Sequence, residues 1–160
     1  MSDKKRLFSV SLLLMALAPA LVTDNSLATD SWFVALAHQM VPPTPRSAVT
    51  QLFDAGAVDT DGFRDMVISF GGEFKESLPT SGRVGAILIP DHEITDHLLR
   101  NEGVFVFPTE IEYKVDDTIQ GQFFMSGSIQ TKVAFPRYRV YLYNETTSGA
   151  SMSVFVYRSR

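Results

Sequence analysis

The chain has 160 residues and a mass of 17.8 kDa, which corresponds to about one domain. Its composition, 45% hydrophobic and 20% charged, is too apolar for a disordered segment. The absence of cysteine excludes a disulfide scaffold, a cysteine-ligated metal site and a cysteine nucleophile. A net charge of −4 argues against nucleic-acid binding, which requires clustered Lys and Arg to neutralise phosphates.

Residues 1–28 form an apolar N-terminal segment with the layout of a signal peptide. Three basic residues at 4–6 precede the almost wholly apolar stretch 7–22, and the small residues Ser26 and Ala28 fit a cleavage site. The apolar stretch is interrupted by Pro19 and is shorter than the ~20 residues of a membrane-spanning helix, so no membrane span is expected. Two interpretations stay open: a cleaved signal peptide, or an uncleaved apolar helix buried in a core or against a partner subunit. Residues 29–160 are expected to form a single β-rich domain.

Between Asp30 and Gly56 the apolar spacing predicts two helices. Asp30 is the expected N-cap of the first, which ends before Pro42. Thr44 is the expected N-cap of the second, and Gly56 stands where a left-handed C-cap belongs. The apolar faces of the two helices are made of Phe33, Leu36, Ala37 and Met40, and then of Ala48, Val49, Leu52 and Phe53.

Beyond residue 62 the apolar period falls from near 3.6 to 2, which indicates strands. In 109–115 the alternation is clearest, because Glu110, Glu112 and Lys114 point outward while the residues between them are apolar. Such alternation is typical of an antiparallel sheet with one solvated face. The predicted strands are Met66–Phe70, Arg83–Ile89, Val104–Phe107, Thr109–Val115, Ile119–Met125, Ser128–Phe135, Arg137–Tyr143 and Met152–Tyr157.

A short helix is predicted to interrupt this series of strands. Asp91 is its expected cap, Gly103 its expected stop, and Ile94, Leu98 and Leu99 its inward face. The whole pattern predicts a mainly β protein, an antiparallel β-sandwich that is jelly-roll-like and carries two or three short helices. The alternative is an α+β fold, in which the N-terminal helices cover one antiparallel sheet.

The densest group of ionisable residues lies at the start of that helix. His92 and Asp96 share a helix face, but His92 and His97 are five residues apart and point in different directions. A zincin needs its two histidines four apart, so these three residues are only weak candidates for metal ligands. A metal-dependent enzyme is therefore the third functional hypothesis, and no cofactor is expected.

Charge is unevenly distributed along the chain. Residues 91–120 hold eight acidic and two basic side chains, whereas residues 121–160 hold one acidic and five basic. The alternation predicts an Arg/Tyr strip on an exposed sheet face, a composition typical of recognition surfaces. Its expected members are Arg137, Arg139, Tyr141 and Tyr143, with Arg158 and Arg160 on the neighbouring strand. An acidic region of a second copy is one expected partner, and such head-to-tail pairing builds rings, shells or filaments.

The second half of the chain combines a strand at Arg83–Ile89, a short helix in the loop that follows, and a closing pair of strands at Arg137–Tyr143 and Met152–Arg158. A polar turn that contains glycine joins the closing pair. At the level of this pattern, Arg83–Arg160 resembles the jelly-roll coat proteins of small icosahedral viruses. The resemblance implies a non-enzymatic, self-assembling subunit located in a virion or an assembled particle.

The chain departs from coat proteins that package RNA, because its N-terminus has only three basic residues before it turns apolar. This departure puts direct genome binding in doubt and favours a shell-lining role or assembly without a basic arm. The main alternative function is an exported binding module for a carbohydrate, an anion or a protein. That module would be secreted or periplasmic after cleavage of the signal peptide.

Overall fold

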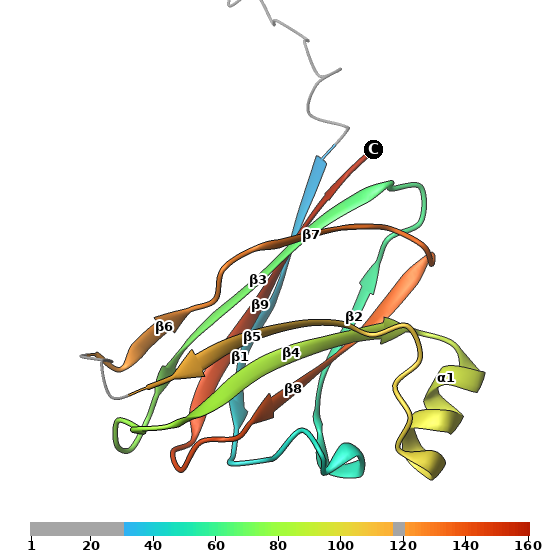
Figure 1. The fold of residues 1–160 in the computed structure, drawn as a ribbon. Coiled ribbons are helices and arrows are strands. Elements are labelled where there is room, and N and C mark those ends of the chain that lie inside the picture. Colours follow the sequence, from blue (N-terminus) through green and yellow to red (C-terminus); the bar gives the residue numbers. More distant parts are fainter. Residues whose placement is uncertain (1–30, 117–120) are drawn as a thin grey trace, which may run out of the picture.

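The structure is a computed structural model that describes residues 31–116 and 121–160, and Figure 1 shows their arrangement. The prediction for residues 1–28 therefore lies outside the described part of the chain. The strands are β1 (Ser31–Val41), β2 (Phe53–Asp59), β3 (Asp65–Phe74), β4 (Gly82–Pro90), β5 (Thr109–Val115), β6 (Phe123–Met125), β7 (Ile129–Lys132), β8 (Arg137–Asn144) and β9 (Ala150–Ser159). The helical elements are the 3-10 turn η1 (Val49–Gln51), α1 (Glu93–His97) and the π-helical turn η2 (Leu98–Glu102).

The strands form two antiparallel sheets that pack face to face. Sheet A has the order β1-β9-β3-β6, with β7 also paired to β3, and sheet B has the order β2-β8-β4-β5. All registered pairs are antiparallel. The predicted mainly β, antiparallel sandwich is thus confirmed, and the alternative with N-terminal helices on a single sheet is wrong.

The strand pairs are nested within one another along the chain. The first strand pairs with the last (β1 with β9), the second with the last but one (β2 with β8), and β3 with β6 and β7. The innermost pair is β4 with β5. The chain therefore follows the path of one long antiparallel hairpin that has been rolled up, so that β9 also pairs with β3 and β8 with β4.

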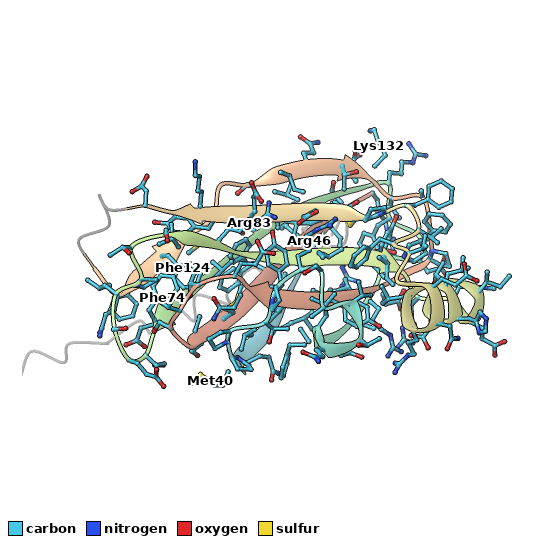
Figure 2. The ribbon with its side chains drawn as sticks, turned by 60° about the horizontal axis from the view of Figure 1, so that its bottom comes forward. Met40, Arg46, Phe74, Arg83, Phe124 and Lys132 are labelled. Atoms are coloured by element: carbon cyan, nitrogen blue, oxygen red, sulfur yellow. The ribbon has the colours of Figure 1, made fainter. Side chains whose placement is uncertain are left out.

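The main core lies between the two sheets. Phe70, Phe74, Leu88 and Leu142 are fully buried there. The ring of Phe124 on β6 closes one end of the core, with its centroid 4.7 Å from that of Phe74. Figure 2 shows these two rings close together at the end of the sandwich away from α1. Burial of each such side chain contributes about 1.5–3 kcal/mol, which is the main stabilisation of the sandwich.

A second apolar cluster lies on the outer face of sheet B. Ile87 and Ile89 of β4 and Tyr141 and Tyr143 of β8 form its floor, and Leu52 and Leu99 cover it from the segments around η1 and η2. The Tyr143 ring lies across β4, where a Cβ on Gly85 would come within 2.3 Å of it. The chain therefore covers the outer face of sheet B with its own loops.

The two helices predicted between Asp30 and Gly56 are wrong, because this region forms β1, η1 and β2. In β1 the register with β9 shifts between Leu36 and Gln39, which removes the strict alternation expected of a strand. In β2 the register with β8 shifts between Asp54 and Gly56. Gly56 adopts its positive φ of +114° at this irregularity of the strand and does not cap a helix. Thr44 is not an N-cap, since its backbone forms an isolated bridge with Asn144.

The helix predicted after Asp91 is present, with two differences. Its N-cap is His92, and Ile94 is 64% exposed, whereas the prediction placed it inward. Gly103 ends η2 in the left-handed conformation, as predicted. The predicted strand Val104–Phe107 is absent from the structure. β3 continues past residue 70 through two glycines. β6 and β7 are shorter than the strands predicted there. Part of the predicted 119–125 strand lies outside the described residues.

Candidate interaction surfaces

The side chains of the predicted Arg/Tyr strip share one face of β8, but that face is largely covered. Arg137 is exposed and Arg139 is partly buried, while Tyr141 and Tyr143 belong to the buried cluster on sheet B. The alternation therefore identified the face correctly, and the expectation that the whole face is exposed is wrong. The physical reason is that the segments around η1 and η2 cover the two tyrosines.

The two arginines of β8 are paired within the chain. Asp91 forms an ion pair with Arg137, whose Nε lies 2.9 Å away, and accepts a hydrogen bond from Arg139 Nε at 3.1 Å, while Asp54 lies 3.0 Å from an Arg139 guanidinium nitrogen. Burial lowers the pKa of Arg139, but its hydrogen bonds and charge interactions with Asp91 and Asp54 outweigh burial and raise it. The basic charge expected to meet a second copy is thus largely neutralised by neighbouring carboxylates.

The two tyrosine hydroxyls are buried without a hydrogen bond of ordinary geometry to the described residues. Burial is the main cause that raises the pKa of Tyr143, and the Glu110 carboxylate beside it raises it further. Burial also raises the pKa of Tyr141, with Asp54 adding to the effect. Both phenols are therefore held in the neutral form.

Arg158 belongs to β9 of sheet A, and Arg160 follows the end of that strand, so neither lies in the sheet that contains β8. Arg158 is only 8% exposed and donates a hydrogen bond to the carbonyl oxygen of Asp59. Its guanidinium carbon lies 4.6 Å from the centroid of the Phe63 ring, and that of Arg160 lies 5.6 Å from the same centroid. These two side chains fix the turn between β2 and β3, and the expectation that they flank the strip on β8 is wrong because β8 and β9 lie in different sheets.

The three weak metal candidates each interact locally. His92 Nδ1 accepts the backbone N–H of Ile94, Asp96 accepts both hydrogen bonds from Arg100 Nε at 2.9 Å, and His97 Nδ1 lies 2.9 Å from Asn101 Nδ2. Among the residues that the structure describes, no three His, Asp or Glu side chains come together as a metal-binding group. His92, Asp96 and His97 therefore cap and stabilise a short helix.

A charged cluster joins sheet B to the adjacent loops. Arg46 Nε lies 2.9 Å from Glu110, and the Arg46 backbone N–H donates to Glu145 at 3.0 Å. Arg83 pairs with both Glu145 and Glu112. Burial raises the pKa of Glu145, but the bonds to Arg83 and Arg46 outweigh it and lower the pKa. Figure 2 shows Arg46 and Arg83 near each other. Arg46 pairs with Glu110 and Arg83 with Glu145, so both arginines of this cluster are paired within the chain.

On the outer face of sheet A, the loops that the structure describes do not form a cover like the one on sheet B. A groove of about 680 Å³ crosses it, lined by β3, β6 and β9. Phe123 and Met125 of β6 stand at this groove with 78% and 61% of their surfaces exposed. The Met125 side chain packs directly over Gly71 of β3, where a Cβ would come within 2.9 Å of the Met125 sulfur. We call the surface formed by Gly71, Phe123, Met125, Ser151, Ser153 and Phe155 the groove.

A second exposed apolar surface lies at the end of the sandwich that carries α1. Ile94 is 64% and Phe107 72% exposed, and both border a depression of about 350 Å³. The Phe107 ring packs on Phe135 with a centroid distance of 5.8 Å. Phe107 has a φ of +46°, a backbone conformation that costs a bulky residue about 1–2 kcal/mol. We call Ile94 and Phe107 the knob.

Both apolar surfaces were missed in the sequence, although a signal for the groove was present. Phe123, Phe124 and Met125 are three apolar residues in succession, so one face of that short strand had to be apolar and outward. No comparable pattern marks the knob, because Phe107 lies in an irregular segment.

In the described part of the chain, no helix is long and apolar enough to cross a bilayer.

Comparisons with known proteins give little further information. No family model matches the chain, and no curated protein matches it. Among solved structures, it is similar to a chain of the crystal structure of the infectious bursal disease virus VP2 subviral particle, with a TM-score of 0.23 and 11% sequence identity. The match covers 81% of this chain and 41% of that chain, so this chain spans less than half the length of its neighbour. A TM-score this low is a weak likeness to a capsid protein and does not transfer a function.

Proposed function

We propose that this chain is a non-enzymatic structural protein, a jelly-roll subunit that assembles with itself into a shell or particle of the virion-coat type. The observation that carries the proposal is the difference between the two outer faces of the sandwich. Sheet B is covered by the chain's own loops, whereas in the described residues of sheet A the large apolar side chains Phe123 and Met125 at the groove are exposed. Exposed apolar surface of this kind is typical of protein interaction sites.

The nested strand pairs support the jelly-roll part of the proposal. If β6 and β7 are counted as one interrupted strand, each sheet has four strands and the chain has eight. Eight strands in two sheets, rolled up from one long hairpin, form the jelly-roll architecture. This architecture occurs in both viral shell proteins and lectins. The architecture alone does not choose between these functions, and the exposed apolar side chains of sheet A are what supports assembly.

The extent of the apolar surface also fits assembly. Met40 and Tyr157 lie on the same face of sheet A as the groove and are 53% and 45% exposed. Together with Phe123 and Met125 they leave roughly 470 Å² of apolar side chain in solvent, taking ~200 Å² for each whole side chain. This is the size of the largest apolar patch on an ordinary monomer, and such patches are often functional.

The test is the mass of the full-length protein in solution, measured by light scattering behind a sizing column, with the intact chain mass read from the same fraction. We expect a particle of many copies for the wild type. We expect a small species for Phe123→Lys/Met125→Lys, because two charges replace the apolar rim of the groove. The matched control Thr50→Lys/Gln51→Lys adds the same charge at exposed positions in and beside η1 and should assemble like the wild type. A wild-type monomer at the highest soluble concentration would overturn the proposal.

A second candidate function is an exported binding module that uses the same groove. A volume of about 680 Å³ falls within the range of small-molecule sites, and Ser151 and Ser153 supply polar groups beside the aromatic rings. A carbohydrate or a protein segment suits this mixture of groups. A monomer whose mass shows that the chain starts at Thr29 would favour this function over assembly.

A further inference from the structure

We infer that N-glycosylation at Asn144 and the native fold exclude each other, so that the chain reaches its folded form only with the amide of Asn144 unmodified. Asn144, Glu145 and Thr146 match the Asn-X-Ser/Thr pattern that accepts N-linked sugars, and we call these three residues the acceptor sequence. A pattern of this kind that carries a sugar ordinarily lies in an exposed loop. Here it ends β8 and begins the turn that leads to β9. The inference does not rest on the proposed function.

The first observation is that every polar atom of the Asn144 side chain is engaged. Its Nδ2 donates to the carbonyl oxygens of Val41 at 3.1 Å and of Ser148 at 2.8 Å. Its Oδ1 accepts from the backbone N–H of Thr146 at 3.1 Å and from the Thr146 hydroxyl at 2.7 Å. A side-chain amide has two N–H donors and two acceptor lone pairs, so all four are used. The two side chains that define the acceptor sequence are thus bonded to each other.

The second observation is that the same group is buried. Asn144 and Ser148 are fully buried, and Thr146 is 6% exposed. The backbone of Asn144 is fixed as well, since it exchanges two hydrogen bonds with Thr44 at 2.7 and 2.9 Å. A sugar-transfer enzyme therefore finds neither the amide nor the hydroxyl of the acceptor sequence at the surface of the folded chain.

The third observation is that the middle residue of the acceptor sequence is also held. The Glu145 carboxylate pairs with Arg83 and accepts the backbone N–H of Arg46 at 3.0 Å. Its carbonyl oxygen lies so close to the start of β4 that a Cβ on Gly82 would come within 2.3 Å of it. The whole acceptor sequence is thus packed against other parts of the chain, and a bulky sugar on its asparagine would displace them.

The chemistry of the modification shows why the two states exclude each other. Transfer forms a bond between the anomeric carbon of the sugar and Asn144 Nδ2, breaks the bond from that carbon to the phosphate of its carrier, and releases one Nδ2 proton to solvent. The amide then keeps one N–H, so the carbonyl of Val41 or of Ser148 loses its donor in a buried place. A sugar added before folding would keep the turn from closing, and the closed turn gives the enzyme no access to the amide.

This exclusion bears on where the chain matures. In the secretory pathway of a eukaryotic cell, sugar transfer would compete with closure of the turn, whereas a compartment without N-glycosylation presents no such competition. The chain suits the second kind of compartment. Of the candidate functions above, a binding module exported from a eukaryotic cell is the one that conflicts with the inference.

The test offers the folded full-length protein to a soluble N-glycosyltransferase that moves one glucose from UDP-glucose to Asn-X-Ser/Thr sequences. The matched control is Lys75→Asn/Ser77→Thr, which places the same tripeptide at positions 75–77, all of them exposed. A synthetic peptide of residues 137–150 presents the acceptor sequence in unfolded form. Mass spectrometry of the intact chains and of their peptides reports whether one hexose is added and at which residue.

We expect rapid transfer to position 75 of the control variant and to Asn144 of the peptide. At Asn144 of the folded protein we expect transfer at least about 100-fold slower, because a buried amide reacts only from opened states.

Asn144→Asp supplies a second measurement, since it keeps the shape of the side chain but removes both N–H donors. We expect it to lower the urea concentration at the unfolding midpoint by roughly 1 M. Asn101→Asp makes the same change at an exposed position and should leave the midpoint nearly unchanged.

Three results would overturn the inference. One is a folded wild type that accepts the sugar at Asn144 about as fast as the control variant does at position 75 and still unfolds cooperatively. Another is an Asn144→Asp protein with the urea midpoint of the wild type, since the amide would then not hold the turn. The last is a peptide that the enzyme refuses, because the residues around Asn144 and not the fold would then block transfer.

Discussion

The Tyr143 ring is buried on the outer face of sheet B, against a glycine of β4 and below the segments around η1 and η2. Its hydroxyl stands beside the Glu110 carboxylate, and burial with that charge raises the pKa of the phenol above its usual value. The neutral phenol is tolerated in this position, whereas a phenolate would be both desolvated and repelled. The residue thus links the pH of the solution to the stability of the covered face.

This link gives a prediction for alkaline pH. An unfolded tyrosine loses its proton near pH 10, while the folded protein retains it at Tyr143, so the unfolded state binds fewer protons above that pH. The free energy of unfolding should therefore be unaffected by this group below about pH 10 and should fall above it, by up to about 1.4 kcal/mol per pH unit. Urea unfolding between pH 9 and pH 11 measures the slope, and Tyr143→Phe should make it shallower.

The matched control for this prediction is Tyr157→Phe, which removes a hydroxyl from a side chain that is 45% exposed. An equal change of slope in the two variants would contradict the role assigned to Tyr143. A steeper slope in Tyr143→Phe would contradict it as well.

At the scale of elements, ion pairs join strands that are distant in sequence. Asp91 follows β4 and holds both arginines of β8, and Asp54 of β2 holds Arg139 from the other side. A charge reversal at Arg137 and Arg139 would therefore place new carboxylates beside these two aspartates. Such a variant tests folding as much as assembly, which is why the assembly test above uses the groove.

For this ion-pair group we expect Asp91→Asn to lower the free energy of unfolding by about 1–2 kcal/mol. The reason is that a carboxylate which accepts from two arginines is replaced by a neutral amide. Asp61→Asn, at an exposed turn position, is the control and should change the free energy of unfolding by less than about 0.5 kcal/mol. Urea unfolding at neutral pH measures both, and equal effects would contradict the structural role of Asp91.

The strands after residue 80 were largely predictable, because β5 and its neighbours alternate regularly. β5 was predicted with its observed bounds, and its buried Ile111 and Val115 are the predicted inward residues. β1 and β2 were not predictable by the same means. A register shift in β1 replaces alternation with an i, i+3, i+4 spacing, and the positive-φ Gly56 is equally typical of a helix end.

At the scale of the whole molecule, alternation tells which side chains share a face, and tertiary layers decide whether that face meets solvent. The sequence pattern placed Tyr141 and Tyr143 on one face with the arginines, which is how β8 presents them. Their burial depends on η1 and η2, which arrive from distant parts of the chain. The pattern could not show this cover, and so the predicted surface fell on the covered sheet while the exposed apolar side chains of sheet A were missed.

The apolar character of the proposed contact also predicts how assembly responds to salt. Electrostatic pairing between an acidic block of one copy and a basic block of another would weaken as NaCl rises from about 0.01 M to about 1 M. The reason is that the Debye screening length shortens from ~30 Å to ~3 Å over this range. A contact made through the apolar side chains at the groove should keep its strength or gain it over this range. Light scattering of the wild type in a salt series measures the mean mass, and a steep fall would contradict the apolar contact.

The nested order of strands has a consequence for biosynthesis. β9 is a central strand of sheet A and β8 a central strand of sheet B, and both are synthesised after the other described strands. Until they emerge, β1 and β2 lack the strands they pair with and β3 lacks β9, so only β4 with β5, and β3 with β6 and β7, can pair. The groove, which needs β9 beside β3, therefore cannot form before β9 has been synthesised. A nascent chain that still lacks β9 thus cannot contact another chain through this surface.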